Sequence, residues 1–151
     1  MRGNRSRYLI LVFIESLLNQ PGYKAVLMYR VMFYFGKNED SFLCRRISSA
    51  IKKRLLHNFG LDIATNVKIG GGLRIEHPVG IVIGRNVLIG KNCTIMQGVT
   101  IGLKNILDSD LECPKIGDSV FIGVNASLLG KIHIGSNTFI KAHSLITRSL
   151  N

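Results

Sequence analysis

The stretch IGDSVFIGVNASLLGKIHIGSNTFIKAHSLI, residues 116–146, decides the fold because an aliphatic residue returns at every sixth position. The same spacing begins upstream at Ile63, and in seven of thirteen cases a glycine follows the aliphatic residue. A period of six fits neither the 3.6-residue helix nor an uninterrupted two-residue strand alternation. It predicts short strands joined by tight turns and stacked coil upon coil, so that each unit is covered by its neighbours. The aliphatic positions are Ile63, Ile69, Ile75, Ile83, Ile89, Ile95, Ile101, Ile116, Ile122, Leu128, Ile134, Ile140 and Ile146.

The repeat is interrupted twice. Eight residues separate Ile75 from Ile83 where six are expected, and fifteen separate Ile101 from Ile116 where twelve would keep the phase. Functional sites are expected where an otherwise consistent pattern breaks, so both interruptions are candidate sites. The first contains His77. The second, residues 103–114, contains Asp108, Asp110, Glu112, Cys113 and Pro114.

Residues 1–60 have a different composition from residues 61–151. They hold nine of the eleven aromatic residues and four of the sixteen glycines, and eleven Lys and Arg against three acids. A first helix is predicted from Pro21 to a stop at Gly36. A second is predicted after Asp40 or Ser41 and up to Gly60. Its apolar stripe would be Leu43, Ile47, Ile51 and Leu55. We therefore predict an N-terminal helical region, 1–60, and a repeat domain, 61–151.

Composition restricts the class of protein. Charged residues make up 19% and hydrophobic residues 46% of the 151, which indicates a compact chain and not a disordered one. The net charge of +11 excludes a basic partner, and nucleic acid has no supporting motif. Three cysteines without metal-binding spacing suit a reducing cytosol. The apolar run 8–14 is too short to span a bilayer and has no cleavage site after it, so we expect a retained helix.

Several motifs resemble those of the hexapeptide-repeat acyltransferases, which form left-handed parallel β-helices. The details resemble the serine acetyltransferase branch and its relatives in capsule and exopolysaccharide gene clusters. The matching motifs are PGYKA with YR (21–25 and 29–30), LDI (61–63), EHPVG (76–80), QGVTIG (97–102) and PKIG (114–117). The resemblance implies a mainly β fold, a left-handed parallel β-helix preceded by a short helical region.

The resemblance also implies the site residues. His77 aligns with the family's catalytic base and Asp62 with the carboxylate that orients it, a role that would fix the imidazole tautomer. Fifteen residues separate them, which brings the chain back near the same corner about 4.8 Å higher. The imidazole would take a proton from a hydroxyl, and that oxygen would attack the thioester of acetyl-CoA. Glu76 and Cys113 are implied to bind substrate. Gly102, Ala126, Lys141 and Ala142 are implied to bind acetyl-CoA, without a metal.

Departures from the family pattern bear on the acceptor. Cys113 stands where the family has a histidine that contacts serine, and residues 1–14 contain no counterpart of a second, acidic contact. We therefore expect a sugar hydroxyl in surface polysaccharide biosynthesis as the acceptor. The alternatives are a serine O-acetyltransferase of cysteine biosynthesis and an inactive β-helix that serves as an assembly or binding module. A γ-class carbonic anhydrase is excluded because His77, His133 and His143 lack the zinc-ligand spacing.

The same resemblance implies an assembly. The family's sites lie in clefts between adjacent β-helices, so we expect a homotrimer, or two such trimers paired through the N-terminal helices. The basic surface of those helices is either a solvated face or a peripheral contact with the inner membrane. The expected location is cytoplasmic.

Overall fold

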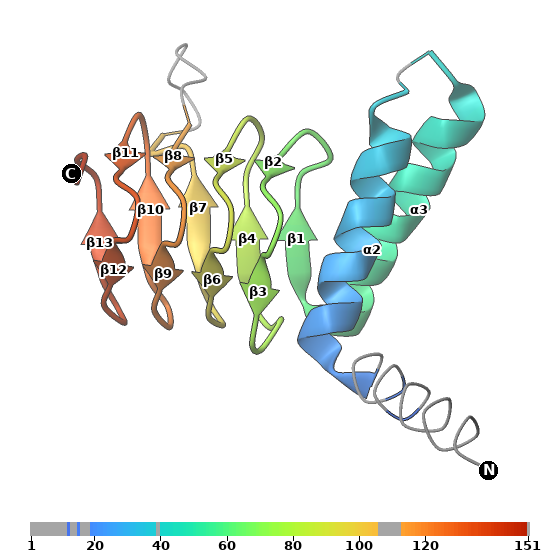
Figure 1. Ribbon diagram of the computed structural model, residues 1–151. Coiled ribbons are helices and arrows are strands. Elements are labelled where there is room, and N and C mark those ends of the chain that lie inside the picture. The colour runs from blue at the N-terminus through green and yellow to red at the C-terminus, as the bar shows by residue number, and fades with distance from the viewer. Residues whose placement is uncertain (1–11, 13–14, 16–18, 39, 106–112, 151) are drawn as a thin grey trace.

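The computed structural model describes residues 12, 15, 19–38, 40–105 and 113–150, and shows two helices packed at one end of a three-sided parallel β-helix (Figure 1). The helices are α2 (Pro21–Gly36) and α3 (Phe42–Phe59). The predicted left-handed β-helix with a preceding helical region is confirmed. The strands are β1 (Leu61–Ile63), β2 (Lys68–Ile69), β3 (Arg74–Ile75), β4 (Ile81–Ile83), β5 (Leu88–Ile89), β6 (Thr94–Ile95), β7 (Thr100–Gly102), β8 (Lys115–Ile116), β9 (Phe121–Ile122), β10 (Ser127–Leu129), β11 (His133–Ile134), β12 (Phe139–Ile140) and β13 (Leu145–Ile146).

Every third strand belongs to the same parallel sheet. The three sheets have the orders β1-β4-β7-β10-β13, β2-β5-β8-β11 and β3-β6-β9-β12. The register places each repeat aliphatic residue above its equivalent, as in the pairing of Ile75 with Ile95 and of Ile95 with Ile122. All but the last of these residues are buried, and each buried side chain contributes about 1.5–3 kcal/mol to folding. Tight corners are made by residues at positive φ, including Asn86, Asn92, Asn125 and Asn137, because Asn tolerates this conformation.

The two interruptions have different sizes in the structure. Ile75 pairs with a residue twenty positions on, whereas Ile83 pairs with Ile101, eighteen positions on. The two extra residues lie in the turn between β3 and β4, as predicted. The second insertion was predicted too small. Ile101 and Ile116 lie on adjacent faces of the prism, where six residues would suffice, so the fifteen-residue spacing adds nine residues and not three.

The helix ends follow the predicted caps with one exception. Ser41 begins α3 by accepting the Cys44 N–H at 3.3 Å, and Gly60 ends it at φ 60°. Gly36 does not stop α2, which includes it and is capped by Lys37. A Cβ at Gly36 would lie 3.1 Å from Ser48 Oγ, so this glycine permits close helix approach.

The predicted stripe of α3 is partly wrong. Leu55 is fully buried, but Leu43 is 65% exposed. Ser48, which the predicted stripe did not include, is buried instead. Its hydroxyl donates to the Met32 carbonyl at 3.0 Å. A polar residue could not be predicted at a core position because its partner is a backbone group of the other helix.

Contacts from α2 fix the helices on the first coil. The Tyr29 hydroxyl donates to the Val67 carbonyl at 2.9 Å, and the Arg30 guanidinium donates to the carbonyls of Ile69 and Gly70. At the start of α2, a Cβ at Gly22 would lie 1.7 Å from the Ile75 carbonyl oxygen. This glycine therefore lets α2 touch the backbone of β3.

Some predictions fall outside the described residues. These are the retained helix over 8–14, apart from Val12, and the positions of the loop acids Asp108, Asp110 and Glu112. Within the described part of the chain, no helix combines the length and apolarity needed to cross a bilayer. The division into domains 1–60 and 61–151 stays a prediction.

Candidate active site

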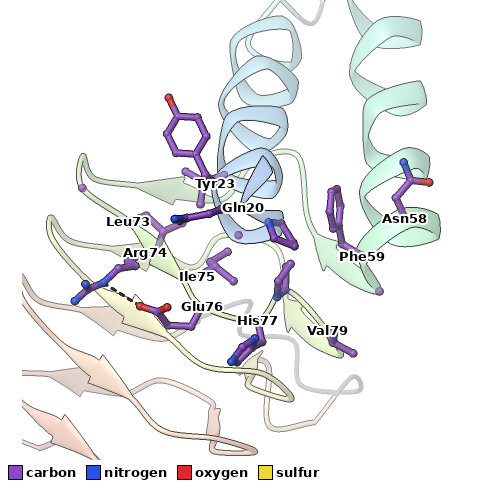
Figure 2. A pocket seen from close by; sticks show the side chains of 16 residues that line it. Gln20, Tyr23, Asn58, Phe59, Leu73, Arg74, Ile75, Glu76, His77 and Val79 are labelled. Carbon is purple, nitrogen blue, oxygen red and sulfur yellow. Dashed lines mark ion pairs between the residues drawn. The ribbon is translucent and has the colours of Figure 1, made fainter. Parts of the chain in front are cut away.

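A cavity of ≈ 1120 Å³ lies where the helices meet the β-helix. It is bounded by the start of α2, the end of α3, and β3 with the turn that follows it (Figure 2). Its polar lining residues are Gln20, Tyr23, Asn58, Arg74, Glu76 and His77. The first interruption of the repeat therefore opens into a cavity that the helices complete.

His77 lies two residues beyond β3, in the turn that holds the extra residues. Its side chain is exposed, and the residue lines the edge of the cavity. The tight contact of Gly22 with Ile75 fixes the backbone just before this turn. A histidine in such a position has the chemistry of a general base near neutral pH.

Arg74 on β3 and Glu76, the first residue after that strand, point toward each other (Figure 2). Arg74 Nε lies 3.4 Å from Glu76 Oε1, and both residues line the His77 cavity. The predicted substrate residue Glu76 is therefore beside His77. The cavity also presents a positive group, which the motif comparison did not indicate.

Asp62 lies on β1, and its carboxylate is engaged by α3. Lys52 Nζ lies 3.1 Å from Asp62 Oδ1. The residue directly above Asp62 in the sheet is Val82, so the fifteen-residue spacing does not stack His77 on it. No hydrogen bond joins the Asp62 and His77 side chains, both of which the structure describes. The orienting role of Asp62 stays a prediction.

Three of the four predicted acetyl-CoA residues lie on the corner that carries His77. Backbone hydrogen bonds stack its successive turns: Gly98 N–H to Val79 O, Asn125 N–H to Gln97 O, and His143 N–H to Val124 O. Ala126 is buried on this corner, and Lys141 and Ala142 are exposed. This corner thus carries the exposed Lys141 and Ala142 on the same stack of turns as the candidate base.

Cys113 and Gly102 lie at another corner of the same chain. Gly102 ends β7, and Cys113 lines a second cavity of ≈ 660 Å³ beside β8. One chain therefore does not bring Cys113 to His77. Burial raises the pKa of the Cys113 thiol, which keeps it protonated near neutral pH and disfavours a role as nucleophile.

Sequence reasoning missed Arg74, Tyr23 and Asn58 as cavity residues. Arg74 occupies an ordinary outward position of the repeat, and its one signal is an acid two residues later. Tyr23 and Asn58 come from opposite ends of two helices whose meeting point no local pattern encodes. In the described residues, no group of three or more His, Cys, Asp or Glu could hold a metal. The prediction of a metal-free reaction is not tested by this.

Comparisons with known proteins agree with the fold. A family model for bacterial transferase hexapeptide (six repeats) matches residues 113–148, and one for the hexapeptide repeat of succinyl-transferase matches residues 80–108. The structure is similar to that of soybean serine acetyltransferase complexed with serine. The TM-score is 0.79 at 32% identity, over 88% of this chain and 53% of the soybean chain.

Sequence relatives give the same family. Serine acetyltransferase 2 of Arabidopsis thaliana is 33% identical over 140 residues, 93% of this chain but 42% of the relative, so the chain spans less than half of that protein. The serine acetyltransferase of Helicobacter pylori is 34% identical over 136 residues, covering 90% of this chain and 77% of the relative. The chain therefore belongs to the serine acetyltransferase family of hexapeptide-repeat acyltransferases.

Proposed function

We propose that this chain is an O-acetyltransferase that transfers acetyl from acetyl-CoA to the hydroxyl of serine. One observation carries the proposal: the exposed imidazole of His77 and the carboxylate of Glu76 line one cavity. Family membership supports the acyl donor and the acceptor, since the relatives are named serine acetyltransferases.

The prediction of a sugar hydroxyl as acceptor is wrong. The matching proteins are serine acetyltransferases, and the soybean structure was solved with serine. The prediction depended on contacts to serine that this chain lacks, notably the histidine replaced by Cys113. The loss of one contact to serine does not identify a different acceptor, because other side chains of the cavity can bind the charged groups of serine.

In the proposed reaction His77 acts as the general base. Its ring nitrogen accepts the proton of the serine hydroxyl, and the oxygen then attacks the thioester carbonyl. The carbon–sulfur bond breaks, and the proton on the imidazolium passes to the leaving thiolate, so that O-acetylserine and CoA are the products. Glu76 binds the serine ammonium. Asp62 is proposed to steady the imidazolium that forms.

The acyl donor is proposed to lie along the corner above His77. Ala142 is small and exposed beside the stacked turns, and Ala126 is proposed to contact the donor although its side chain is buried. Gly102 lies at another corner, so it is proposed to line the donor bound to a neighbouring copy. The exposed ammonium of Lys141 suits a phosphate of the nucleotide part. These residues fit an extended, phosphorylated ligand, and they suit substrate binding only, without a resident cofactor.

The proposal is tested by mixing purified protein with acetyl-CoA and a panel of acceptors. L-serine should release free CoA and yield O-acetylserine by mass spectrometry, while nucleotide sugars and capsule oligosaccharides should not. Protein that binds no acetyl-CoA and transfers nothing would favour the inactive binding module.

We propose further that the chain works as a homotrimer, alone or as paired trimers. Support comes from the separation of Cys113 and His77 at different corners of one chain. A neighbouring copy could bring the Cys113 corner to the His77 cavity and complete the substrate contacts. Sedimentation equilibrium tests this, and a monomer with full activity would contradict it.

The finer expectations on location remain proposals. Exposed basic residues on α3 support peripheral contact with an anionic membrane, and a cytoplasmic location accords with the use of acetyl-CoA. These residues are Arg45, Arg46, Lys53 and Arg54. Co-sedimentation with vesicles containing phosphatidylglycerol tests the contact, and binding should weaken as salt is raised.

A further inference from the structure

The ion pair beside His77 is placed where a substrate can reach it. Arg74 Nε and Glu76 Oε1 are 3.4 Å apart, and their side chains are 70% and 46% exposed. An exposed pair of this kind contributes little to folding stability. Both groups nevertheless line the cavity that holds the candidate base, so the pair is available to a ligand.

The pair uses the Nε edge of the guanidinium. The two terminal nitrogens of an arginine form the other edge of a planar fork that matches a carboxylate in a bidentate manner. Glu76 offers a carboxylate that can accept hydrogen bonds from an ammonium. Two opposite charges, Arg74 on β3 and Glu76 directly after it, thus mirror the charges of an α-amino acid.

We propose that Arg74 is a specificity-determining residue that binds the carboxylate of the acceptor while Glu76 binds its ammonium. This inference rests on the proposed function and names how this chain recognises its substrate. A β-hydroxy-α-amino acid held at both charges presents its hydroxyl to His77. The positive group of Arg74 supplies a carboxylate contact in a chain where Cys113 has replaced a family contact to serine.

The test measures separately how much the carboxylate and the ammonium of the substrate contribute to binding. Dissociation constants are measured by NMR titration for L-serine, for ethanolamine, which lacks the carboxylate, and for 3-hydroxypropanoate, which lacks the ammonium. Arg74→Met should weaken L-serine and 3-hydroxypropanoate about tenfold, the low end for a charge-assisted contact, and leave ethanolamine within about twofold. Arg74→Lys should recover part of the loss, since an ammonium retains the charge but not the fork.

Two variants complete the design. Glu76→Gln should weaken L-serine and ethanolamine but not 3-hydroxypropanoate. Arg54→Met removes the same charge from an exposed position of α3 outside the cavity, and it should change none of the three constants.

The binding measurement keeps this inference separate from the proposed reaction. Loss of L-serine binding in Arg74→Met with ethanolamine unchanged supports the inference, whether or not acetyl is transferred. Equal changes for L-serine and ethanolamine, or a wild-type protein that binds ethanolamine as tightly as L-serine, would overturn it. A wild-type protein that binds L-serine in this selective way but transfers no acetyl would overturn the proposed function alone.

Discussion

The two interruptions of the hexapeptide repeat differ in length and in the cavity that each one borders. The first adds two residues at a turn that packs beneath α2, and it carries His77 and Glu76 in one cavity. The second is longer, and at its end the described residues place a buried Cys113 beside a smaller cavity. A break in the repeat thus marks a candidate site, and at the first break the packing of α2 on the coil places an exposed histidine in a cavity.

The largest expected effect compares the two corners directly. His77→Ala should lower kcat for acetyl transfer to L-serine by about 10²–10⁴-fold, because it removes the proposed general base. Cys113→Ala should raise KM for L-serine a few fold and leave kcat unchanged, as expected for a residue that contacts substrate without taking part in chemistry. Steady-state kinetics of both variants measure the difference. Equal losses of kcat would remove the distinction between the corners.

The second prediction tests the packing of α2 against the coil just before His77, a contact that distinguishes this corner from the one near Cys113. Gly22→Ala places a methyl group against the Ile75 carbonyl, and the backbone there cannot move aside as a side chain could. We expect a loss of about 3 kcal/mol in the free energy of unfolding, measured by urea denaturation. Gly71→Ala is the matched control, because a Cβ at Gly71 meets nothing within 4 Å. A Gly22→Ala protein as stable as this control would contradict the close approach of α2.

The third prediction weakens the same attachment without steric conflict. Tyr29→Phe removes a buried hydroxyl and leaves the Val67 carbonyl without its donor. The free energy of unfolding should fall by about 1.5 kcal/mol. Tyr34→Phe alters a ring that is 72% exposed, and its effect should stay below about 0.5 kcal/mol. If both variants match the wild type, the hydroxyl does not hold α2.

The smallest expected effect is on the reactivity of the Cys113 thiol, at the corner away from His77. Burial raises the pKa of Cys113, so its thiolate forms only as the pH rises above the range of an ordinary thiol. In a Cys44→Ser, Cys93→Ser protein, alkylation by iodoacetamide should be slow at pH 7 and accelerate toward pH 10, as followed by mass spectrometry. Rapid labelling at pH 7 would indicate an activated thiol and reopen a catalytic role for this residue.

The buried core of the β-helix was predictable because each inward position follows from the six-residue repeat in the nearby sequence. One aliphatic residue in six determines each inward position, and the paired Ile75, Ile95 and Ile122 follow from counting. The Gly60 cap was equally readable, whereas the N-cap was predicted as Asp40 or Ser41 and the structure selects Ser41. The size of the second insertion was misjudged because the sequence does not show on which face the next strand resumes.

The site was predictable only in part. His77 and Glu76 were predicted from motifs and line one cavity, and their roles stay predictions. The residues that complete the cavity come from separate elements. Arg74 was missed because an outward position of the repeat accepts any polar residue, and its meaning depends on a cavity formed by distant helices. The acceptor was misjudged for the same reason, since missing family contacts were counted and new ones could not be seen.

The most direct test of the central claim is a crystal structure of the wild-type protein with L-serine and CoA, a mixture that cannot react. We expect the serine hydroxyl about 2.6–3.2 Å from a ring nitrogen of His77, its ammonium at Glu76 and its carboxylate at Arg74. Serine bound outside this cavity, or with its hydroxyl out of reach of His77, would contradict the account.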